Sequence, residues 1–166
     1  AGNRLQIATG KQALSSVLLQ LDQFDRAEQL ATEALAIRTD VLEPDHYQLS
    51  DSRELLARIS LQTGRADAAV DLLTSIRTER TNRGDAPSKI AWTESNLGQA
   101  LLAAGRPDEA EASLSAAWSV LASNEGPGPD SPQGRETASA LIELYERTNR
   151  SDRARQIRNK AFPGED

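Results

Sequence analysis

One pattern occurs four times along the 166 residues of this chain, and it restricts the possible folds more than any other feature. Each copy is centred on an alanine, and these alanines are Ala27, Ala69, Ala110 and Ala154. An aspartate lies two residues before each alanine, and a leucine lies thirteen residues before it, at Leu14, Leu56, Leu97 and Leu141. The copies are 42, 41 and 44 residues apart. A period of this length is typical of a stack of similar units, each too small to form a core alone.

Each copy predicts two amphipathic helices joined by a tight turn. In the third copy, Leu97, Leu101 and Leu114 recur at helical spacing on either side of Gly105. The small residues Gly98, Ala110 and Ala117 are expected where the two helices cross closely. The four turns fall at residues that tolerate a positive φ, namely Asp22, Gly64, Gly105 and Asn149. The predicted helices cover residues 4–21, 23–42, 47–63, 66–80, 88–104, 107–123, 132–148 and 151–162.

The third copy resembles the tetratricopeptide repeat through Leu97, Gly98, Leu101, Ala110, Leu114 and Ala117. The period is similar to that of the kinesin-light-chain type, in which a linker rich in Gly, Pro and Asp follows a longer second helix. Residues 42–46 and 128–132 resemble that linker. The resemblance implies an all-α fold, an α-α superhelix forming a right-handed solenoid of about four helical hairpins.

We expect a single domain over residues 1–166, with repeats at about 5–46, 47–87, 88–131 and 132–162. The chain has no methionine, so we also expect it to be a fragment of a longer protein. Leu5 and Ile7 are apolar before the first repeat begins. Two interpretations stay open for them: they close the end of the array, or they pack on a preceding repeat.

The residues needed for catalysis or for a cofactor are missing. The chain has no cysteine, and its one histidine, His46, lies in a linker, where capping of the next helix explains it. Prolines interrupt the glycines at residues 126–128, which therefore do not form a phosphate-binding loop. Each of the four repeated aspartates falls in the first turn of a predicted helix, where its negative charge interacts favourably with the helix dipole. The four lie on successive units and therefore cannot converge on one metal ion. We predict no enzyme, no cofactor and no metal site.

Charge and hydropathy exclude two classes of partner. The last predicted helix carries Arg153, Arg155, Arg158 and Lys160, but the net charge of −6 argues against nucleic acid. We interpret these residues as the polar face of a terminal unit. No apolar run approaches the roughly 20 residues of a membrane span, and no signal peptide is visible. The compartment stays open, with a cytoplasmic location favoured.

The resemblance places the candidate site on the first helix of each repeat, because in that family these helices line a groove that receives a peptide. One face of these helices carries the candidate residues, which are Asp51, Glu54, Arg58, Trp92, Asn96, Gln99, Glu136 and Glu143. Asn96 matches the asparagine with which the family holds a peptide backbone. Trp92 is either an aromatic anchor or packing at a repeat junction. Acids outnumber arginines on this face, which favours a basic partner, although the acids can equally serve solubility.

We therefore predict a non-catalytic protein–protein interaction module that binds a peptide segment in the groove. Two alternatives belong to other classes: a self-assembling scaffold element that forms homo-oligomers, and a regulatory appendage of a multidomain bacterial enzyme such as a protein kinase. The composition, rich in Ala, Arg, Leu and Asp, hints at a bacterial source.

Overall fold

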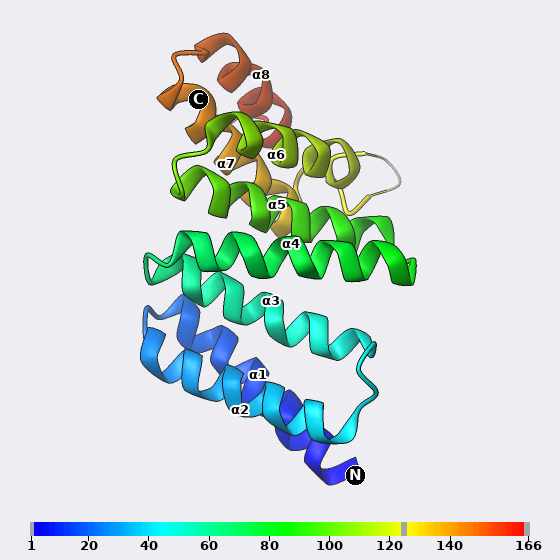
Figure 1. The fold of residues 1–166 in the computed structure, drawn as a ribbon. Helices are drawn as coiled ribbons and strands as arrows, with labels where there is room; N and C mark the ends of the chain where they lie inside the picture. Colours follow the sequence, from blue (N-terminus) through cyan, green and yellow to red (C-terminus); the bar gives the residue numbers. More distant parts are fainter. Residues whose placement is uncertain (1, 124–125, 165–166) are drawn as a thin grey trace. The chain divides into compact units, whose positions relative to one another are not determined.

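A computed structural model describes residues 2–123 and 126–164, and over these residues it contains eight α-helices and no β-strand (Figure 1). The helices are α1 (Gly2–Gln20), α2 (Phe24–Val41), α3 (Tyr47–Gln62), α4 (Ala66–Arg83), α5 (Pro87–Ala103), α6 (Pro107–Leu121), α7 (Pro132–Arg147) and α8 (Ser151–Ala161). The predicted all-α class and the positions of all eight helices are confirmed. The largest difference is at the end of α4, which continues three residues beyond the predicted Arg80.

The chain divides into two compact units, Ala1–Arg83 with α1 to α4 and Gly84–Asp166 with α5 to α8. Each unit is built from two hairpins, α1–α2 and α3–α4 in the first, α5–α6 and α7–α8 in the second. Within a unit the second helix of one hairpin packs on the first helix of the next, as α2 does on α3 and α6 on α7. The expectation of one domain over residues 1–166 stays a prediction.

The four hairpin turns share one geometry. Asp22 and Asn149 have φ of 56° and 57°, and Gly64 and Gly105 have φ of 77° and 75°. In every turn, the backbone N–H of the next residue donates to the carbonyl five residues earlier, at 2.7–2.9 Å. This bond and the left-handed residue define a Schellman ending of the first helix. The prediction of positive φ at these four residues is confirmed.

Local capping also follows the sequence. Ser131 precedes Pro132, and its Oγ accepts a hydrogen bond from the backbone N–H of Gly134 at 3.0 Å. His46 precedes α3, and its Nδ1 accepts from the backbone N–H of Gln48 at 3.2 Å. Both contacts satisfy N–H groups that have no partner within a helix. The histidine is therefore a helix cap.

The crossing of α5 and α6 explains the small residues of the repeat. A Cβ added at Gly98 would lie 2.5 Å from Cγ of Leu114 and 3.2 Å from the carbonyl oxygen of Ala110. Leu114, Ala110 and Ala117 are fully buried at this crossing. The central alanines of the other copies, Ala27, Ala69 and Ala154, are buried as well. The alanines of the repeat, together with Leu97 and Leu141, are therefore close-packing positions, whereas Leu56 is half-buried and Leu14 of the first copy is exposed.

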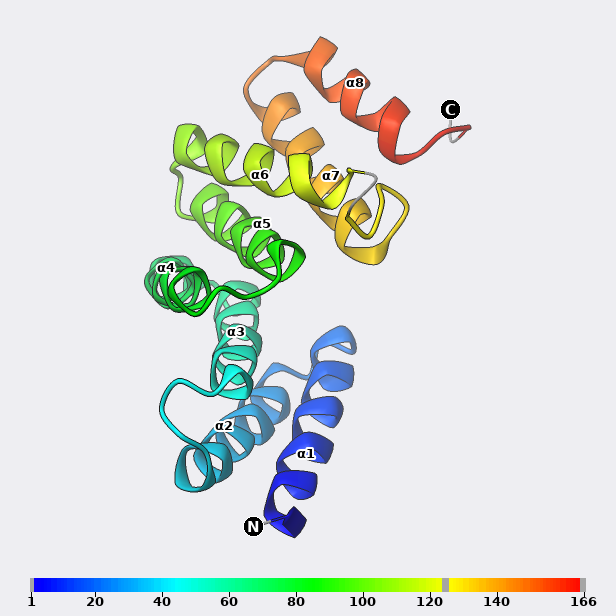
Figure 2. The same cartoon turned by 90° about the vertical axis from the view of Figure 1, so that its right-hand side faces the viewer.

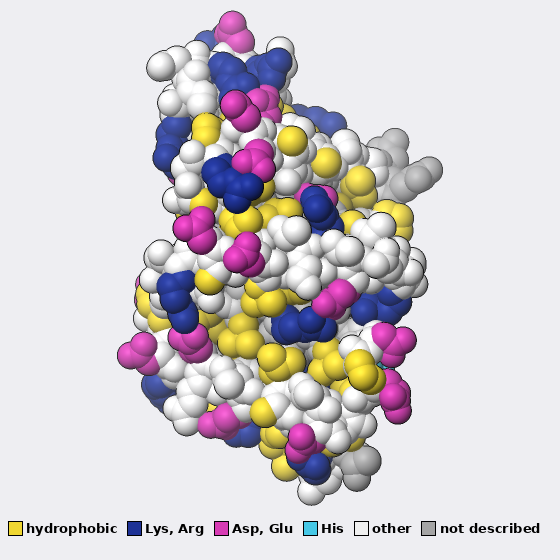
Figure 3. Space-filling view, viewed as in Figure 1, with side chains coloured by type: hydrophobic (Ala, Val, Ile, Leu, Met, Phe, Trp, Pro, Cys, Tyr) yellow, Lys and Arg dark blue, Asp and Glu magenta, His cyan; other side chains and the backbone are white. Residues whose placement is uncertain are grey.

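The basic residues of α8, and Arg150 just before it, contact acidic or aromatic residues of the same unit. Glu111 of α6 accepts from Arg150 at 2.5 Å and from Arg153 at 2.6 Å, and Arg158 pairs with Glu146 at 2.7 Å. Lys160 lies over the ring of Trp118. Acidic and basic side chains are interspersed on the face drawn in Figure 3. These basic residues are therefore held by contacts within their own unit, and the interpretation of α8 as the polar face of a terminal unit stays a prediction.

The Glu111 pairs predict a pH-dependent contribution to stability. Burial by itself would raise the pKa of Glu111, but the hydrogen bond from Arg150 and the charges of Arg150 and Arg153 outweigh it and lower that pKa. A lowered folded pKa stabilises the protein above the unfolded value, about 4.3, and this contribution is lost as the pH falls through the folded pKa. Replacing Glu111 with glutamine should therefore lower the free energy of unfolding at pH 7 by about 1 kcal/mol.

Urea denaturation of Glu111→Gln and wild type, followed by circular dichroism from pH 7 to pH 3, measures this difference. We expect it to shrink toward the acid end of the series. Asp130→Asn, at an exposed linker position of the same unit, provides the control and should change stability little at any pH. If the free energy of unfolding of Glu111→Gln stays below that of wild type by the same amount at the lowest pH, the role of the ionised carboxylate is contradicted.

Candidate functional site

The predicted site residues lie on first helices of hairpins, and the first helices of each unit contact one another. In the first unit α1 contacts α3, and in the second unit α5 contacts α7. Asp51, Glu54 and Arg58 lie on α3 and are called the α3 set here. The remaining residues lie on α5 and α7 and form the α5–α7 set, which consists of Trp92, Asn96, Gln99, Glu136 and Glu143. Each unit therefore contains its own part of the predicted site.

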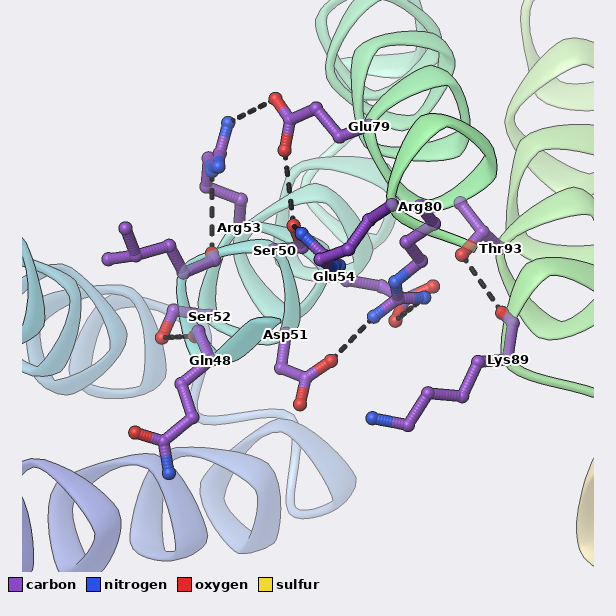
Figure 4. A network of polar contacts seen from close by, with 12 residues as sticks. Gln48, Ser50, Asp51, Ser52, Arg53, Glu54, Glu79, Arg80, Lys89 and Thr93 are labelled. Carbon is purple, nitrogen blue, oxygen red and sulfur yellow. Dashed lines mark hydrogen bonds and ion pairs between the residues drawn. The ribbon is translucent and has the colours of Figure 1, made fainter. Parts of the chain in front are cut away.

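Both acids of the α3 set are paired with Arg80 of α4 (Figure 4). Arg80 Nη2 lies 2.6 Å from Oδ1 of Asp51, and Arg80 Nη1 lies 2.8 Å from Oε2 of Glu54. The exposed fraction of the side chain is 2% for Arg80, 9% for Glu54 and 29% for Asp51. The guanidinium thus neutralises negative charge from inside the unit. Of the α3 set, Asp51 and the half-buried Arg58 are the side chains that reach solvent.

A second buried arginine occupies the same place in the first hairpin. Arg38 follows its central alanine Ala27 by eleven residues, as Arg80 follows Ala69. Its Nη1 donates to Oγ of Ser52 at 2.5 Å and to Oε1 of Gln12. Burial lowers the pKa of Arg38, while the charge of Asp51 acts in the opposite direction.

Sequence reasoning missed both arginines, although a signal was present in the repeat. An arginine recurs at one offset in two copies, on the helix face that otherwise carries Ala27, Ala31 and Ala34. A charged residue at a repeated core position indicates a repeated buried partner. The partner is the residue fifteen before the central alanine, which is Gln12 in the first copy and Glu54 in the second.

The α5–α7 set is joined by polar contacts between its two helices. Gln99 Nε2 donates to Oε1 of Glu136 at 3.4 Å. Beneath them, the hydroxyls of Ser95 and Thr137, which sequence reasoning did not single out, share a buried hydrogen bond of 2.7 Å. These contacts place the half-buried Gln99 and Glu136 side by side between the two helices.

The other three members of this set differ in their access to solvent. Asn96 is only 2% exposed, so little of its amide reaches the surface. Trp92 is half-buried. Glu143 is exposed and pairs loosely with Arg147 one turn along α7, at 3.4 Å. A ligand approaching this face would meet carboxylates and an amide, with the indole of Trp92 also partly accessible.

Two further properties concern the described residues as a whole. They contain no group of three or more His, Asp or Glu side chains placed to hold a metal ion. None of their helices combines the length and apolar character needed to cross a membrane.

Comparison with known families assigns the chain to a class. Residues 6–77 match one model described as tetratricopeptide repeat, and residues 91–116 match a second model with the same description. These matches, together with the hairpins and their turns, identify the chain as a tetratricopeptide repeat protein. No curated protein shows a significant match to the sequence.

Solved structures share the fold at low sequence identity. A putative kinesin light chain from Podosopora anserina with nearly identical TPR-like repeats is 19% identical, with a TM-score of 0.77, over 95% of this chain and 74% of that one. A Rap protein complexed with Competence and Sporulation Factor is 18% identical, with a TM-score of 0.83, over 95% and 42%. BtubC from P. vanneervenii is 21% identical, with a TM-score of 0.75, over 95% and 62%. The chain thus spans less than two thirds of the last two structures.

Proposed function

We propose that this protein is a non-catalytic interaction module that binds a peptide segment on the first helices of its hairpins. The observation that carries the proposal is the side-by-side arrangement of α5 and α7, with Gln99 and Glu136 in contact between them and Glu143 exposed. Amide and carboxylate groups can accept hydrogen bonds from a peptide backbone and from Lys or Arg side chains. The Rap structure, complexed with Competence and Sporulation Factor, supports binding of a partner by this fold.

The charge pattern refines the expected ligand. Arg80 already compensates Asp51 and Glu54, so the α3 set offers little free negative charge. Glu136 is half-buried and Glu143 is exposed, so in this proposal their carboxylates are the ones that contact a basic segment. Attraction between partly exposed charges is screened by salt, so the affinity should fall as the ionic strength rises.

Selection from a random peptide library on the immobilised chain would test this function. We expect the selected sequences to be enriched in Lys and Arg. Fluorescence anisotropy with the best peptide should then show weaker binding by Glu136→Gln/Glu143→Gln, by about tenfold for two lost charge contacts of roughly 0.5–1 kcal/mol each. Raising the salt concentration should also weaken binding by the wild type.

Asp71→Asn is the matched control, because Asp71 is exposed on α4 and lies outside the first helices. It removes one surface carboxylate and should leave the affinity unchanged. Binding that the control weakens as much as the double variant would place the ligand elsewhere. Selected peptides without basic residues would contradict the charge preference.

A further inference from the structure

The outer face of α1 carries a row of exposed apolar side chains. Ile7, Leu14, Val17 and Leu21, the last of these just after the helix end, have exposed fractions between 46% and 60%. They recur at intervals of three or four along the helix, with Gly10 in the same row, and are called the α1 stripe here. Figure 2 shows α1 beside α2 at the edge of its unit. Single exposed apolar residues are ordinary, but several on one helix face form a patch that marks an interaction site.

The repeat shows what normally covers this face. Leu14 corresponds to Leu56 of α3 and to Leu141 of α7, and Val17 corresponds to Ile59 and Leu144. Leu56 and Ile59 pack in a cluster with Ala27 and Ala31 of α2. Leu141 and Leu144 are buried on α7, which packs on α6. In both units, therefore, the second helix of the preceding hairpin packs over the equivalents of Leu14 and Val17, which α1 leaves exposed.

We propose that the α1 stripe is a docking site for an amphipathic helix with a face of alanine and leucine, placed as α2 is placed on α3. The interface continues the packing already present between hairpins within each unit. The α2 face that contacts α3 supplies the model for the occupant, since it presents Ala27, Leu30 and Ala31. Small residues of this kind let helix axes approach closely.

Gly10 adds a requirement for the occupant. The equivalent residue is Ser52 in α3, which accepts from Arg38 of the preceding hairpin, and Thr137 in α7, which bonds Ser95 of the preceding hairpin. Gly10 has no side chain to make such a bond, and no atom lies within 4 Å of where its Cβ would be. An arginine like Arg38 would therefore lose its hydroxyl partner here. The occupant should carry an apolar residue at that place.

α8, the last helix that the structure describes, does not meet the requirement, which argues against head-to-tail stacking of two copies. α8 carries Arg158 where α2 has Ala31, and Arg158 is paired with Glu146 at 2.7 Å. Covering the stripe with α8 would bury this charge against leucine and valine, which is unfavourable without a partner for the charge. The chemistry favours a separate helix with an uncharged face.

A stapled peptide tests the proposal directly. The probe has the sequence of residues 23–42 with Arg38→Leu, and a hydrocarbon staple joins the positions of Thr32 and Ala36, which are exposed in α2. The staple removes much of the cost of ordering a short helix. Titration calorimetry with the whole chain should show saturable binding. Leu14→Glu should weaken it by more than about tenfold, because docking would bury an ionised carboxylate.

Control measurements test whether the probe binds at the α1 stripe. Leu14→Gln, a milder change, should also weaken binding, and circular dichroism should show both variants folded, since Leu14 is exposed. In the protein itself, Ala36→Glu changes a residue exposed on α2 and should leave binding of the probe unchanged. A probe that retains Arg38 should bind more weakly than the Arg38→Leu probe. Glu136→Gln/Glu143→Gln should have no effect, because these residues belong to the peptide site on α7.

Two results would overturn the proposal. One is a probe that fails to bind, or that binds wild type and Leu14→Glu equally. The other comes from light scattering over a range of concentrations. A dimer that Leu14→Glu converts to monomer would assign the stripe to a second copy of this chain.

Discussion

Replacing Arg80 with methionine is expected to lower the free energy of unfolding by about 3–5 kcal/mol. Arg80 is almost fully buried between α3 and α4 and pairs with Asp51 and Glu54. Methionine fills a similar volume but removes the positive charge opposite the buried carboxylate of Glu54. The loss of stability should therefore come from electrostatics rather than from a cavity. Urea denaturation followed by circular dichroism measures it.

Two further variants serve as a surface control and as a test of the ion pair. Arg26→Met changes an exposed arginine on α2 and should alter stability by less than about 0.5 kcal/mol. Arg80→Met combined with Glu54→Leu should recover much of the lost stability, because an apolar pair can replace a buried ion pair at little cost. If Arg80→Met behaves like Arg26→Met, the pairing contributes nothing to stability and the prediction is wrong.

Changing Gly98 to alanine should destabilise the second unit, whereas the same change at Gly10 should stabilise the first. The Cβ at position 98 would lie 2.5 Å from Cγ of the fully buried Leu114 and 3.2 Å from the backbone oxygen of Ala110, so the packing there must shift to admit it. Overpacking costs about 1–3 kcal/mol and exceeds the roughly 1 kcal/mol that alanine gains over glycine in a helix. At Gly10 the space is open, so only that gain of about 1 kcal/mol applies.

The sign of the effect is therefore the readout. Thermal or urea unfolding of Gly98→Ala, Gly10→Ala and wild type should place the two variants on opposite sides of wild type. Adding Leu114→Ala to Gly98→Ala should show favourable coupling, because the smaller side chain removes the clash. Equal gains in stability from both alanines would show that α5 and α6 are not closely packed at this crossing.

The helices and their turns were predictable because each depends on residues close together in sequence. The offset that placed a turn at Asp22, Gly64, Gly105 and Asn149 needs only the local preference for positive φ. The close approach at Gly98 was also predictable, since a residue without a side chain lies between Leu97 and Leu101 on the first helix of the third copy.

The electrostatics of the site were harder to predict. Asp51 and Glu54 appeared as groove acids because helical spacing gives the face of a side chain but not its partner on another helix. The side chain of Arg80 bridges from α4 to α3, and its contacts depend on the distance between those helices. The burial of Asn96 depends in the same way on how neighbouring helices pack. The exposed Leu14 shows a related limit, since a repeat pattern alone does not show which of its leucines another helix covers.

The buried arginines have a consequence for how such a chain can grow. Glu54 and the arginine that neutralises it belong to the same copy of the repeat, as do Gln12 and Arg38. A duplication of the second copy would therefore carry both the buried carboxylate and its cation, and the array could gain that hairpin without gaining an uncompensated internal charge. The first copy differs, because its buried Arg38 is bonded to the neutral amide of Gln12 within the copy and to the hydroxyl of Ser52 in the next one. The second copy is therefore the more self-contained module of the two.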